Sequence, residues 1–371
     1  MHPLFMLMAV VGIGSGLYSL YQRVPVVAPA TLFISLVGLM VRTWQLTREK
    51  SQDASPSGGI DFAALRAKDF RRYAPWLKDN VRGHDPVIDS LTRRLQQGLE
   101  LAGANRTLGT FLLVGPTGTG KTFLAEMAAR ALYPGSEPLI LRMNQYKHSD
   151  DVFTLLGPPP GSAGYEVGGA LTRPVLENPQ RVILLDEIDK CHPDIRDCLY
   201  NILDTAQCRE KSSGRPVHFH ACAFFATCNS GVESLRQLEL TKPDAATRIG
   251  RARDALARSG GFEKSFLARF DEIFLMDELP LMSVAEVACL QLAKHWKEYG
   301  IEVTYASPEI LVDAIRRNSE FSEYGVRQLS HLIQGMADPW IEAARKGGAS
   351  KVRLDVEPGT GKINVVLQDA A

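Results

Sequence analysis

A glycine-rich segment that ends in lysine and threonine is the clearest chemical signal in this sequence. It follows an apolar run at 110–114 and precedes a helix-like stretch at 123–132. Its glycines let successive backbone N–H groups face a polyphosphate, and the helix adds the positive end of its dipole. Lys121 is placed to reach the β- and γ-phosphates, and Thr122 to hold Mg²⁺. The phosphate-binding residues that we expect are Gly115, Pro116, Thr117, Gly118, Thr119, Gly120, Lys121 and Thr122.

Two carboxylates follow another apolar run, about 65 residues further along the chain. The run at 181–185 has the pattern of a buried parallel strand, and Asp186 and Glu187 come directly after it. Asp186 is placed to orient Mg²⁺, directly or through water, and Glu187 to polarise the attacking water. Together the two motifs predict that the chain binds ATP with Mg²⁺ and hydrolyses it.

The composition is that of an ordinary globular protein and argues against several kinds of site. Lys and Arg together number 42, as do Asp and Glu, so the basic excess of a typical nucleic-acid-binding protein is absent. Six cysteines, at positions 191, 198, 208, 222, 228 and 289, form no C-x-x-C pair and no zinc-like spacing with histidine. Unpaired cysteines and ATP chemistry both indicate the reducing side of a membrane.

The N-terminal sequence predicts a membrane anchor over residues 1–45. Two charge-free, largely apolar runs cover 3–22 and 24–41, each close to the length that crosses the hydrocarbon of a bilayer. Basic residues follow the second run, which favours a helical hairpin with both ends in the cytosol. A single span with the other run at the interface, and a cleaved signal peptide, are the alternatives. We expect the protein at a membrane, such as a bacterial inner membrane, with lipid as a partner.

The remaining chain is organised as an α/β domain followed by a smaller domain. Residues 46–78 contain a Ser- and Gly-rich linker and a lead-in helix. Over 79–275 apolar strand candidates alternate with helical stretches, the pattern of a parallel sheet with helices on both faces. The strand candidates are 110–114, 138–142, 182–186, 221–227 and 272–275. Residues 276–371 form a small, mainly helical domain, helical over 283–299 and 307–347, that ends in a pair of short strands.

At these motifs the chain resembles the AAA+ ATPases, specifically the second ATPase module of Clp/ClpB unfoldases, over residues 77–368. The resemblance implies that Val81 contacts the adenine, that Asn229 is the sensor-1 residue, and that Arg327 is the sensor-2 residue. It also implies that Arg269 is an arginine finger, which a neighbouring subunit supplies to the active site. A site shared in this way requires a closed head-to-tail contact, and the family implies a homo-hexameric ring.

Two segments depart from the family pattern. In the loop that lines the central pore of these unfoldases, Ser162 and Ala163 stand where a gripping aromatic pair is expected, with Tyr165 three residues later. A hydroxyl and a methyl group offer little contact area compared with an aromatic ring. Between Asn229 and Arg269 the chain also lacks the apolar tripeptide with which Clp unfoldases dock a peptidase, so we expect no Clp-type peptidase partner.

Two functions remain open from the sequence. The first is a membrane-anchored, ring-forming ATPase that remodels or transports a protein client at the cytosolic face, for example in secretion. The second is a regulatory or scaffolding component of a membrane complex, which uses ATP to switch its assembly state with little threading. The complete hydrolytic set favours the first, whereas Ser162 favours the second. No nucleic-acid partner is expected.

Overall fold

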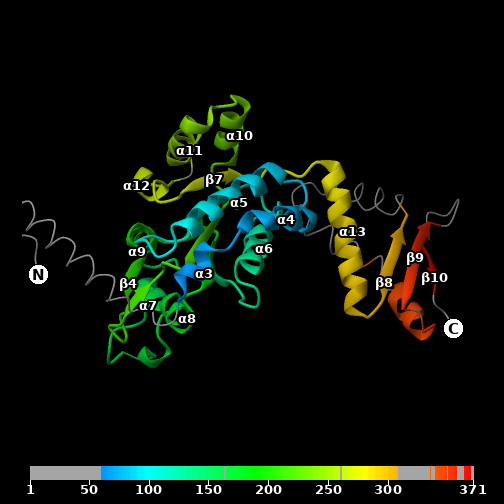
Figure 1. Cartoon of the computed structure of the whole chain (residues 1–371), viewed down its shortest axis with the longest axis horizontal. Helices are drawn as coiled ribbons and strands as arrows, with labels where there is room; N and C mark the ends of the chain where they lie inside the picture. The colour runs from blue at the N-terminus through cyan, green and yellow to red at the C-terminus, as the bar shows by residue number, and fades with distance from the viewer. Residues whose placement is uncertain are drawn as a thin grey trace, which may run out of the picture. The chain divides into compact units, whose positions relative to one another are not determined.

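Five parallel strands form the central sheet of the computed structural model (Figure 1). Their order across the sheet is β2-β3-β6-β1-β7, so β1 lies between β6 and β7. The carboxyl ends of β1, β3 and β6 therefore meet at one edge, where the predicted phosphate, magnesium and sensor-1 residues follow. The strands are β1 (Gly109–Val114), β2 (Leu139–Arg142), β3 (Arg181–Asp186), β6 (Cys222–Cys228) and β7 (Glu272–Leu275). All five lie close to the expected ranges.

The structure describes residues 60–307, except 163 and 260, and then 335, 339–348, 350–356 and 363–368. The chain divides into two units, Met1–Gly58 and Gly59–Ala371, and every described residue falls in the second. None of the helices in this described part has the length and apolarity needed to cross a bilayer. The predicted anchor at 1–45 and the linker at 51–59 lie outside the described residues.

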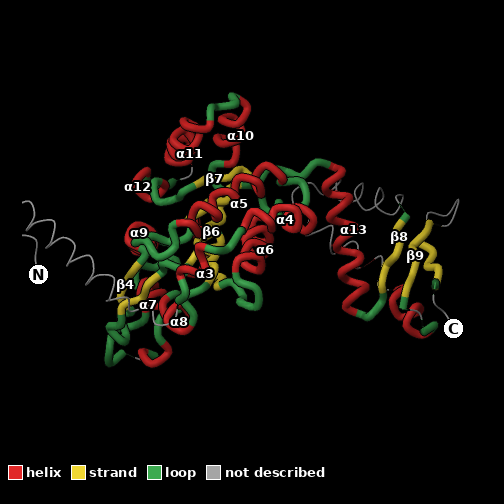
Figure 2. The backbone as a smooth tube through the Cα atoms, in the orientation of Figure 1, coloured by secondary structure: helices red, strands yellow, loops and turns green. Residues whose placement is uncertain are grey.

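Helices cover both faces of the sheet, because its strands are apolar on both sides (Figure 2). In β1, Phe111 and Leu113 belong to one core cluster, and Leu112 and Val114 to the other. The first core takes in residues of α3 (Phe62–Arg66), η1 (Phe70–Tyr73), α4 (Ala74–Asn80), α5 (Asp85–Glu100) and α6 (Lys121–Leu132). The second takes in residues of α7 (Asp151–Leu156), α8 (Thr172–Glu177), α9 (Pro193–Thr205), α10 (Val232–Leu240), α11 (Ala245–Ser259) and α12 (Lys264–Leu267).

A short hairpin that the sequence analysis did not predict joins α9 to β6. Its antiparallel strands are β4 (Gln207–Arg209) and β5 (Pro216–His218). Each strand has only three residues, too few for a recognisable alternation of apolar and polar side chains. Three further 3-10 turns are η2 (Met143–Gln145), η3 (Tyr165–Val167) and η4 (Ile188–Lys190).

The smaller domain contains a long helix and a three-stranded sheet. Helix α13 (Leu281–Glu298) matches the expected helix at 283–299. The two late strands are β9 (Lys351–Val356) and β10 (Ile363–Leu367), and β8 (Glu302–Ala306), which was not predicted, pairs with β9 in parallel. Trp296 is fully buried in the core of this domain. Most of the helical stretch predicted at 307–347 lies outside the described residues.

Candidate functional site

The glycine-rich loop connects β1 to α6, as its sequence predicts. Gly118 and Gly120 take φ values of 86° and 89°, in the left-handed region that glycine adopts without a steric penalty. Gly115 lies so close to the neighbouring chain that a Cβ atom there would be 2.0 Å from the carbonyl oxygen of Met276. Helix α6 begins at Lys121, so its first N–H groups point toward the loop. The backbone thus has the shape of a phosphate cradle.

Lys121 is buried beneath this loop and contacts its carbonyl groups. Its Nζ donates hydrogen bonds to the carbonyl oxygens of Gly115 at 2.7 Å and Pro116 at 2.6 Å. Burial lowers the pKa of Lys121 to about 8, although nearby acidic groups oppose the shift. A lysine ammonium carries three N–H donors, so a third remains for a phosphate oxygen.

A chain of hydrogen bonds joins the loop to β3 and β6. The Thr122 hydroxyl donates to Asp186 Oδ1 at 3.1 Å, and the Thr227 hydroxyl donates to the same oxygen at 2.7 Å. Thr227 also accepts the backbone N–H of Glu187 at 2.8 Å. The two predicted magnesium residues, Thr122 and Asp186, are therefore brought together, and Thr227 fixes both carboxylate residues in place.

Glu187 lies at the sharp turn after β3 and is held by two side chains. Its backbone has φ 59° and ψ 52°, a left-handed conformation that is uncommon outside glycine. Asn144 Nδ2 donates to its Oε2 at 2.8 Å, and Lys190 Nζ donates to its Oε1 at 2.8 Å. The hydrogen bond from Lys190 and, to a smaller extent, that from Asn144 lower the pKa of Glu187. The carboxylate is thus kept ionised, the form that accepts a proton from water.

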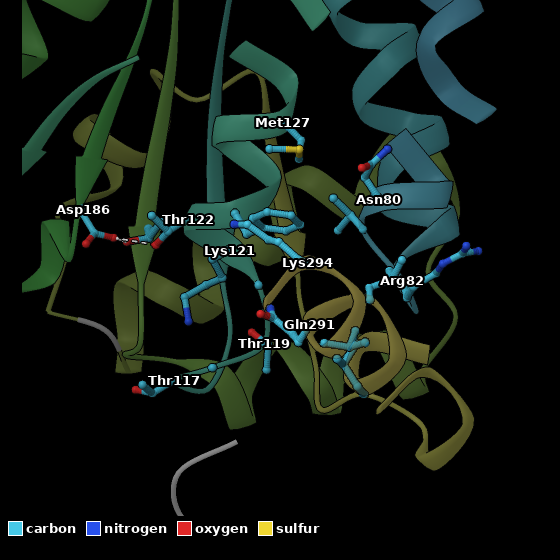
Figure 3. A pocket seen from close by; sticks show the side chains of 18 of the residues that line it. Asn80, Arg82, Thr117, Thr119, Lys121, Thr122, Met127, Asp186, Gln291 and Lys294 are labelled. Atoms are coloured by element: carbon cyan, nitrogen blue, oxygen red, sulfur yellow. Dashed lines mark hydrogen bonds between the residues drawn. The ribbon is translucent and has the colours of Figure 1, made fainter. Parts of the chain in front are cut away.

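These groups open onto a cavity of about 560 Å³ (Figure 3). Of the predicted residues, Val81, Asp186, Glu187 and Asn229 line it, together with residues 117–122 of the loop. Gly115 and Pro116 do not line it, but their carbonyl oxygens hold Lys121. The other lining residues are Asn80, Arg82, Phe123, Met127, Arg130, Thr227, Leu279, Val287, Leu290, Gln291 and Lys294. The cavity is large enough for a drug-sized ligand, and its apolar side includes Val81, Leu279 and Leu290.

The donor set fits a nucleotide with Mg²⁺. Magnesium prefers oxygen ligands and keeps several waters, binding through one or two protein oxygens and the phosphates. Thr122 and Asp186 supply such oxygens beside the cradle. Among the described residues, no group of three or more His, Cys, Asp or Glu side chains is placed to hold a metal. Thr122 and Asp186 would therefore hold Mg²⁺ with the phosphates, while Lys121 and the loop amides would hold the phosphate oxygens.

His84, the residue directly before α5, contacts the glycine-rich loop. Its side chain is buried, and its Nε2 lies 2.8 Å from the carbonyl oxygen of Thr119. Desolvation lowers the pKa of His84, while the Thr119 carbonyl, Asp277 and Asp85 oppose the shift. The neutral imidazole, with its proton on Nε2, thus supports the backbone of the cradle.

Arg269, the predicted finger, is held by helix α9 of its own chain and does not line the cavity. Its guanidinium pairs with the Asp204 carboxylate, donates to the Tyr200 hydroxyl, and lies 4.5 Å from the centre of the Tyr200 ring. About 30% of its side chain is exposed. The backbone carbonyl of Arg269 also accepts from the Thr110 hydroxyl at 2.7 Å. This placement is compatible with a role in a neighbouring site, which stays a prediction.

The predicted pore-loop residues are only partly described. Tyr165 begins η3 and is 43% exposed, and Ser162 is half-buried, with its carbonyl accepting the Tyr165 N–H at 3.3 Å. Val167, which the sequence analysis did not single out, is 75% exposed. Ala163 and the predicted sensor residue Arg327 lie outside the described residues. Arg248, which lies between Asn229 and Arg269, belongs to α11 and pairs with Glu239 and Glu272.

Several residues of the site were missed from the sequence. Thr227 lies at the carboxyl end of a predicted apolar strand, and a threonine there looks like an ordinary β-branched strand residue. Asn144 reaches Glu187 from η2, which no sequence spacing connects to it, whereas Lys190 in η4 lies only three residues after Glu187. The residues of α13 that line the cavity, such as Gln291 and Lys294, come from a domain about 170 residues after the loop. For η2 and η4, the usable sequence signal is only that the predicted strands before them, β2 and β3, end beside β6 at the same edge of the parallel sheet.

Comparison with known proteins places the site in a family context. Residues 106–273 match the family model described as AAA domain (Cdc48 subfamily). The chain is 36% identical over 279 residues to the ATP-dependent Clp protease ATP-binding subunit ClpE of Lactococcus lactis subsp. lactis, covering 72% of this chain and 36% of that protein. It is 30% identical over 270 residues to the chaperone protein ClpB of Malacoplasma penetrans, covering 71% of this chain and 36% of that protein.

A structural comparison gives the same fold. A cryo-EM reconstruction of Hsp104 in a closed state, with ATPγS and FITC casein, superposes with a TM-score of 0.66 at 20% sequence identity, covering 84% of this chain and 53% of that chain. The chain spans about a third of the length of these curated relatives. The relatives point to an ATP-hydrolysing enzyme, and residues 117–122 of the predicted phosphate loop line one cavity with Asp186. The chain therefore contains an AAA+ ATPase domain of the Clp and ClpB type.

Proposed function

We propose that the protein is a membrane-anchored, ring-forming AAA+ ATPase that couples ATP hydrolysis to the remodelling or transport of a protein client at the cytosolic face of a membrane. The observation that carries the ATPase part is the set of hydrogen bonds joining Thr122, Asp186, Thr227 and Glu187 beside the glycine-rich loop. These contacts support a magnesium site and a carboxylate base at one edge of the sheet.

The residues divide the chemistry between them. Lys121 and the loop amides hold the phosphates, and bound Mg²⁺ would neutralise charge on their oxygens. The Glu187 carboxylate, once it releases a donor, accepts a proton from the attacking water. Asn229 lies at the cavity, where its amide can orient that water without competing for the proton. Arg269 of a neighbouring subunit supplies positive charge, which favours a closed ring, six-membered by family resemblance.

The printed names of the relatives support a protein client. One is a protease ATP-binding subunit and another is a chaperone protein. Membrane attachment rests on the sequence alone, through the charge-free runs at 3–22 and 24–41. The proposed location is the cytosolic face of a membrane such as the bacterial inner membrane, and lipid is a proposed partner of the anchor.

Paired variants of the full-length protein test the ATPase proposal. Lys121→Ala should abolish ATP binding, while Glu187→Gln should bind ATP normally and stop its hydrolysis, since one residue holds phosphate and the other acts on water. Equal ATP affinity in wild type and Lys121→Ala would refute the phosphate role. A pull-down from solubilised membranes with Glu187→Gln, compared with Lys121→Ala, should retain the client only in the variant that traps ATP.

Membrane fractionation tests the anchor separately. Full-length protein should require detergent for extraction, whereas a variant that begins near Gly59 should be soluble and bind ATP with unchanged affinity. Recovery of the full-length protein in the soluble fraction without detergent would contradict the anchor and leave the ATPase proposal standing.

A second function, an ATP-switched regulatory or scaffolding component, is favoured by Ser162 and Ala163 in the pore-loop position. It predicts ATP-dependent assembly with little translocation of any polypeptide. Sedimentation with and without ATPγS, together with an unfolding assay on the same sample, distinguishes it from the first proposal.

A further inference from the structure

A buried carboxylate lies where the 157–169 loop meets the β4–β5 hairpin. Glu210, just after β4, is 3% exposed. Its Oε1 accepts the backbone N–H of Gly169 at 3.4 Å and the Thr172 hydroxyl at 3.3 Å, and its Oε2 accepts the Ser213 hydroxyl. One side chain of the hairpin thus satisfies donors at the end of the loop and in the hairpin itself.

The two segments pack closely around this carboxylate. The Lys211 N–H donates to the Leu156 carbonyl at 2.9 Å, at the start of the loop. A Cβ atom at Gly157 would lie 2.7 Å from Ser212 Oγ, and one at Gly168 would lie 2.7 Å from Glu210 Oε1. Both glycines also have positive φ, 95° and 75°. The chain therefore uses glycine at both ends of the loop, where the hairpin approaches it.

Along the chain, each of the two segments also comes after a residue that contacts Glu187. Asn144, in η2, precedes α7 and the 157–169 loop, whereas Lys190, in η4, precedes α9 and the hairpin. The His192 N–H donates to the Tyr146 carbonyl at 2.9 Å, and this hydrogen bond joins the two stretches of chain close to Asn144 and Lys190. The two stretches of chain thus begin at separate contacts with Glu187 and come together again at Glu210.

We propose that Glu210 ties the 157–169 loop and the β4–β5 hairpin into one body, which shifts as a unit when nucleotide changes the contacts of Glu187 and so moves an extended polypeptide client. The movement of a client rests on the proposed function, whereas the link that Glu210 makes between the two segments does not. Glu210 is a positioning residue that acts through Gly169 and Thr172. A carboxylate suits this role because its two oxygens can accept several hydrogen bonds at once.

Hydrogen exchange on the full-length protein tests the tie, in peptides covering the loop and the hairpin, with and without Mg²⁺ and ATPγS. Glu210→Gln should speed exchange near Gly169 by about tenfold or more without nucleotide. In wild type both segments should respond to nucleotide, whereas in Glu210→Gln the hairpin should lose its response. The matched control is Glu166→Gln, which changes an exposed carboxylate in the same loop and should behave as wild type.

Exchange in Glu210→Gln that equals wild type in both segments would overturn the proposal. If Glu210→Gln does not fold, Ser213→Ala removes one donor to the same carboxylate and should speed exchange in both segments. Unchanged exchange in Ser213→Ala would then count against the tie. If the wild-type protein does not bind ATPγS, the ATPase proposal is contradicted. The comparison of Glu210→Gln with wild type in the absence of nucleotide still tests the link between the two segments.

Discussion

The Thr227 hydroxyl donates a hydrogen bond of 2.7 Å to the Asp186 carboxylate, and the same carboxylate oxygen accepts the Thr122 hydroxyl. Asp186 Oδ1 is thereby aimed at the glycine-rich loop by a residue of the neighbouring strand β6. Thr227 also accepts the Glu187 N–H and so stabilises the left-handed turn that presents the catalytic carboxylate. One hydroxyl thus positions both acidic residues of the site.

Removing this hydroxyl should slow hydrolysis more than it weakens binding. Thr227→Val keeps the shape of the side chain but leaves the Glu187 N–H without its acceptor and Asp186 with only the Thr122 hydroxyl as a donor, so we expect kcat to fall about tenfold or more. The dissociation constant for ATP should change by less than about threefold, because the phosphate cradle is untouched. Thr227→Ser, which keeps the hydroxyl, is the control. Steady-state kinetics and nucleotide titration measure both quantities, and a wild-type kcat in Thr227→Val would contradict the assignment.

How far the sequence predicted this site depends on whether a residue lies in a local motif. Residues 115–122 and Asp186 lie where the sequence placed them, because parallel strands bring their carboxyl ends to one edge of the sheet. Lys190 was not predicted, although it lies only three residues after Glu187, because an exposed lysine there looks like an ordinary surface residue. Thr227 and Asn144 were not predicted, since each meets the site through tertiary packing of segments with no shared pattern. The same holds for β8 and for the β4–β5 hairpin, whose strands are too short to carry a periodic signal.

Binding of ATP should weaken as the pH rises above about 8. Burial lowers the pKa of Lys121 to about 8, and phosphate requires its charged form. Below that pH the free protein already carries the proton, whereas above it binding must take up a proton, which costs affinity by up to about tenfold per pH unit. Calorimetry between about pH 7 and about pH 9, in buffers of different ionisation enthalpy, measures both affinity and proton uptake.

Lys121→Arg is the control for this effect, because arginine stays charged throughout the range. Its ATP affinity, even if lower, should vary less with pH, and it should take up no proton on binding. The nucleotide-free wild type should also gain stability as the pH rises from about 8 toward 10.5, because the unfolded chain holds the Lys121 proton more tightly. Equal proton uptake in both proteins would assign the titration to another group.

His84 should make the fold less stable in acid. Its pKa in the folded protein lies below the ordinary value of 6.5, so the unfolded chain binds its proton first as the pH falls. The free energy of unfolding is therefore expected to drop below about pH 6.5 and to level off once folded His84 also titrates. Urea denaturation of the nucleotide-free protein at several pH values measures this. His84→Gln lacks the titration, so wild type should lose stability relative to it in acid, and parallel curves would contradict the prediction.

Arg269 should act on a neighbouring subunit. Within its own chain it is held by Asp204 and Tyr200, away from the cavity that Glu187 lines. Arg269→Ala and Glu187→Gln should each be inactive alone. Mixed, they should regain part of the wild-type rate, because some sites would combine an intact Glu187 with an intact finger. Hydrolysis by mixtures over a range of ratios measures the rescue, and its absence in rings shown to be mixed would argue against action in trans.

The last prediction concerns how strongly the pore-loop residues hold the client polypeptide. With Ser162 and Ala163 in place of an aromatic pair, we expect weak or no unfolding of a generic substrate, such as a tagged, stably folded fluorescent protein, even while ATP is hydrolysed. An aromatic contact adds about 0.5–1.5 kcal/mol beyond area burial, and this difference is repeated by every subunit that touches one chain. Ser162→Tyr with Ala163→Val should therefore raise translocation, measured as folded substrate unfolded per ATP hydrolysed. Tyr165, at 43% exposure, and Val167, at 75%, are large hydrophobic side chains that the described part of the loop exposes. If wild type unfolds this substrate well and Tyr165→Ala abolishes the activity without slowing ATP hydrolysis, the contact that holds the client lies at Tyr165, and the loss of the usual aromatic pair has been compensated within the same loop.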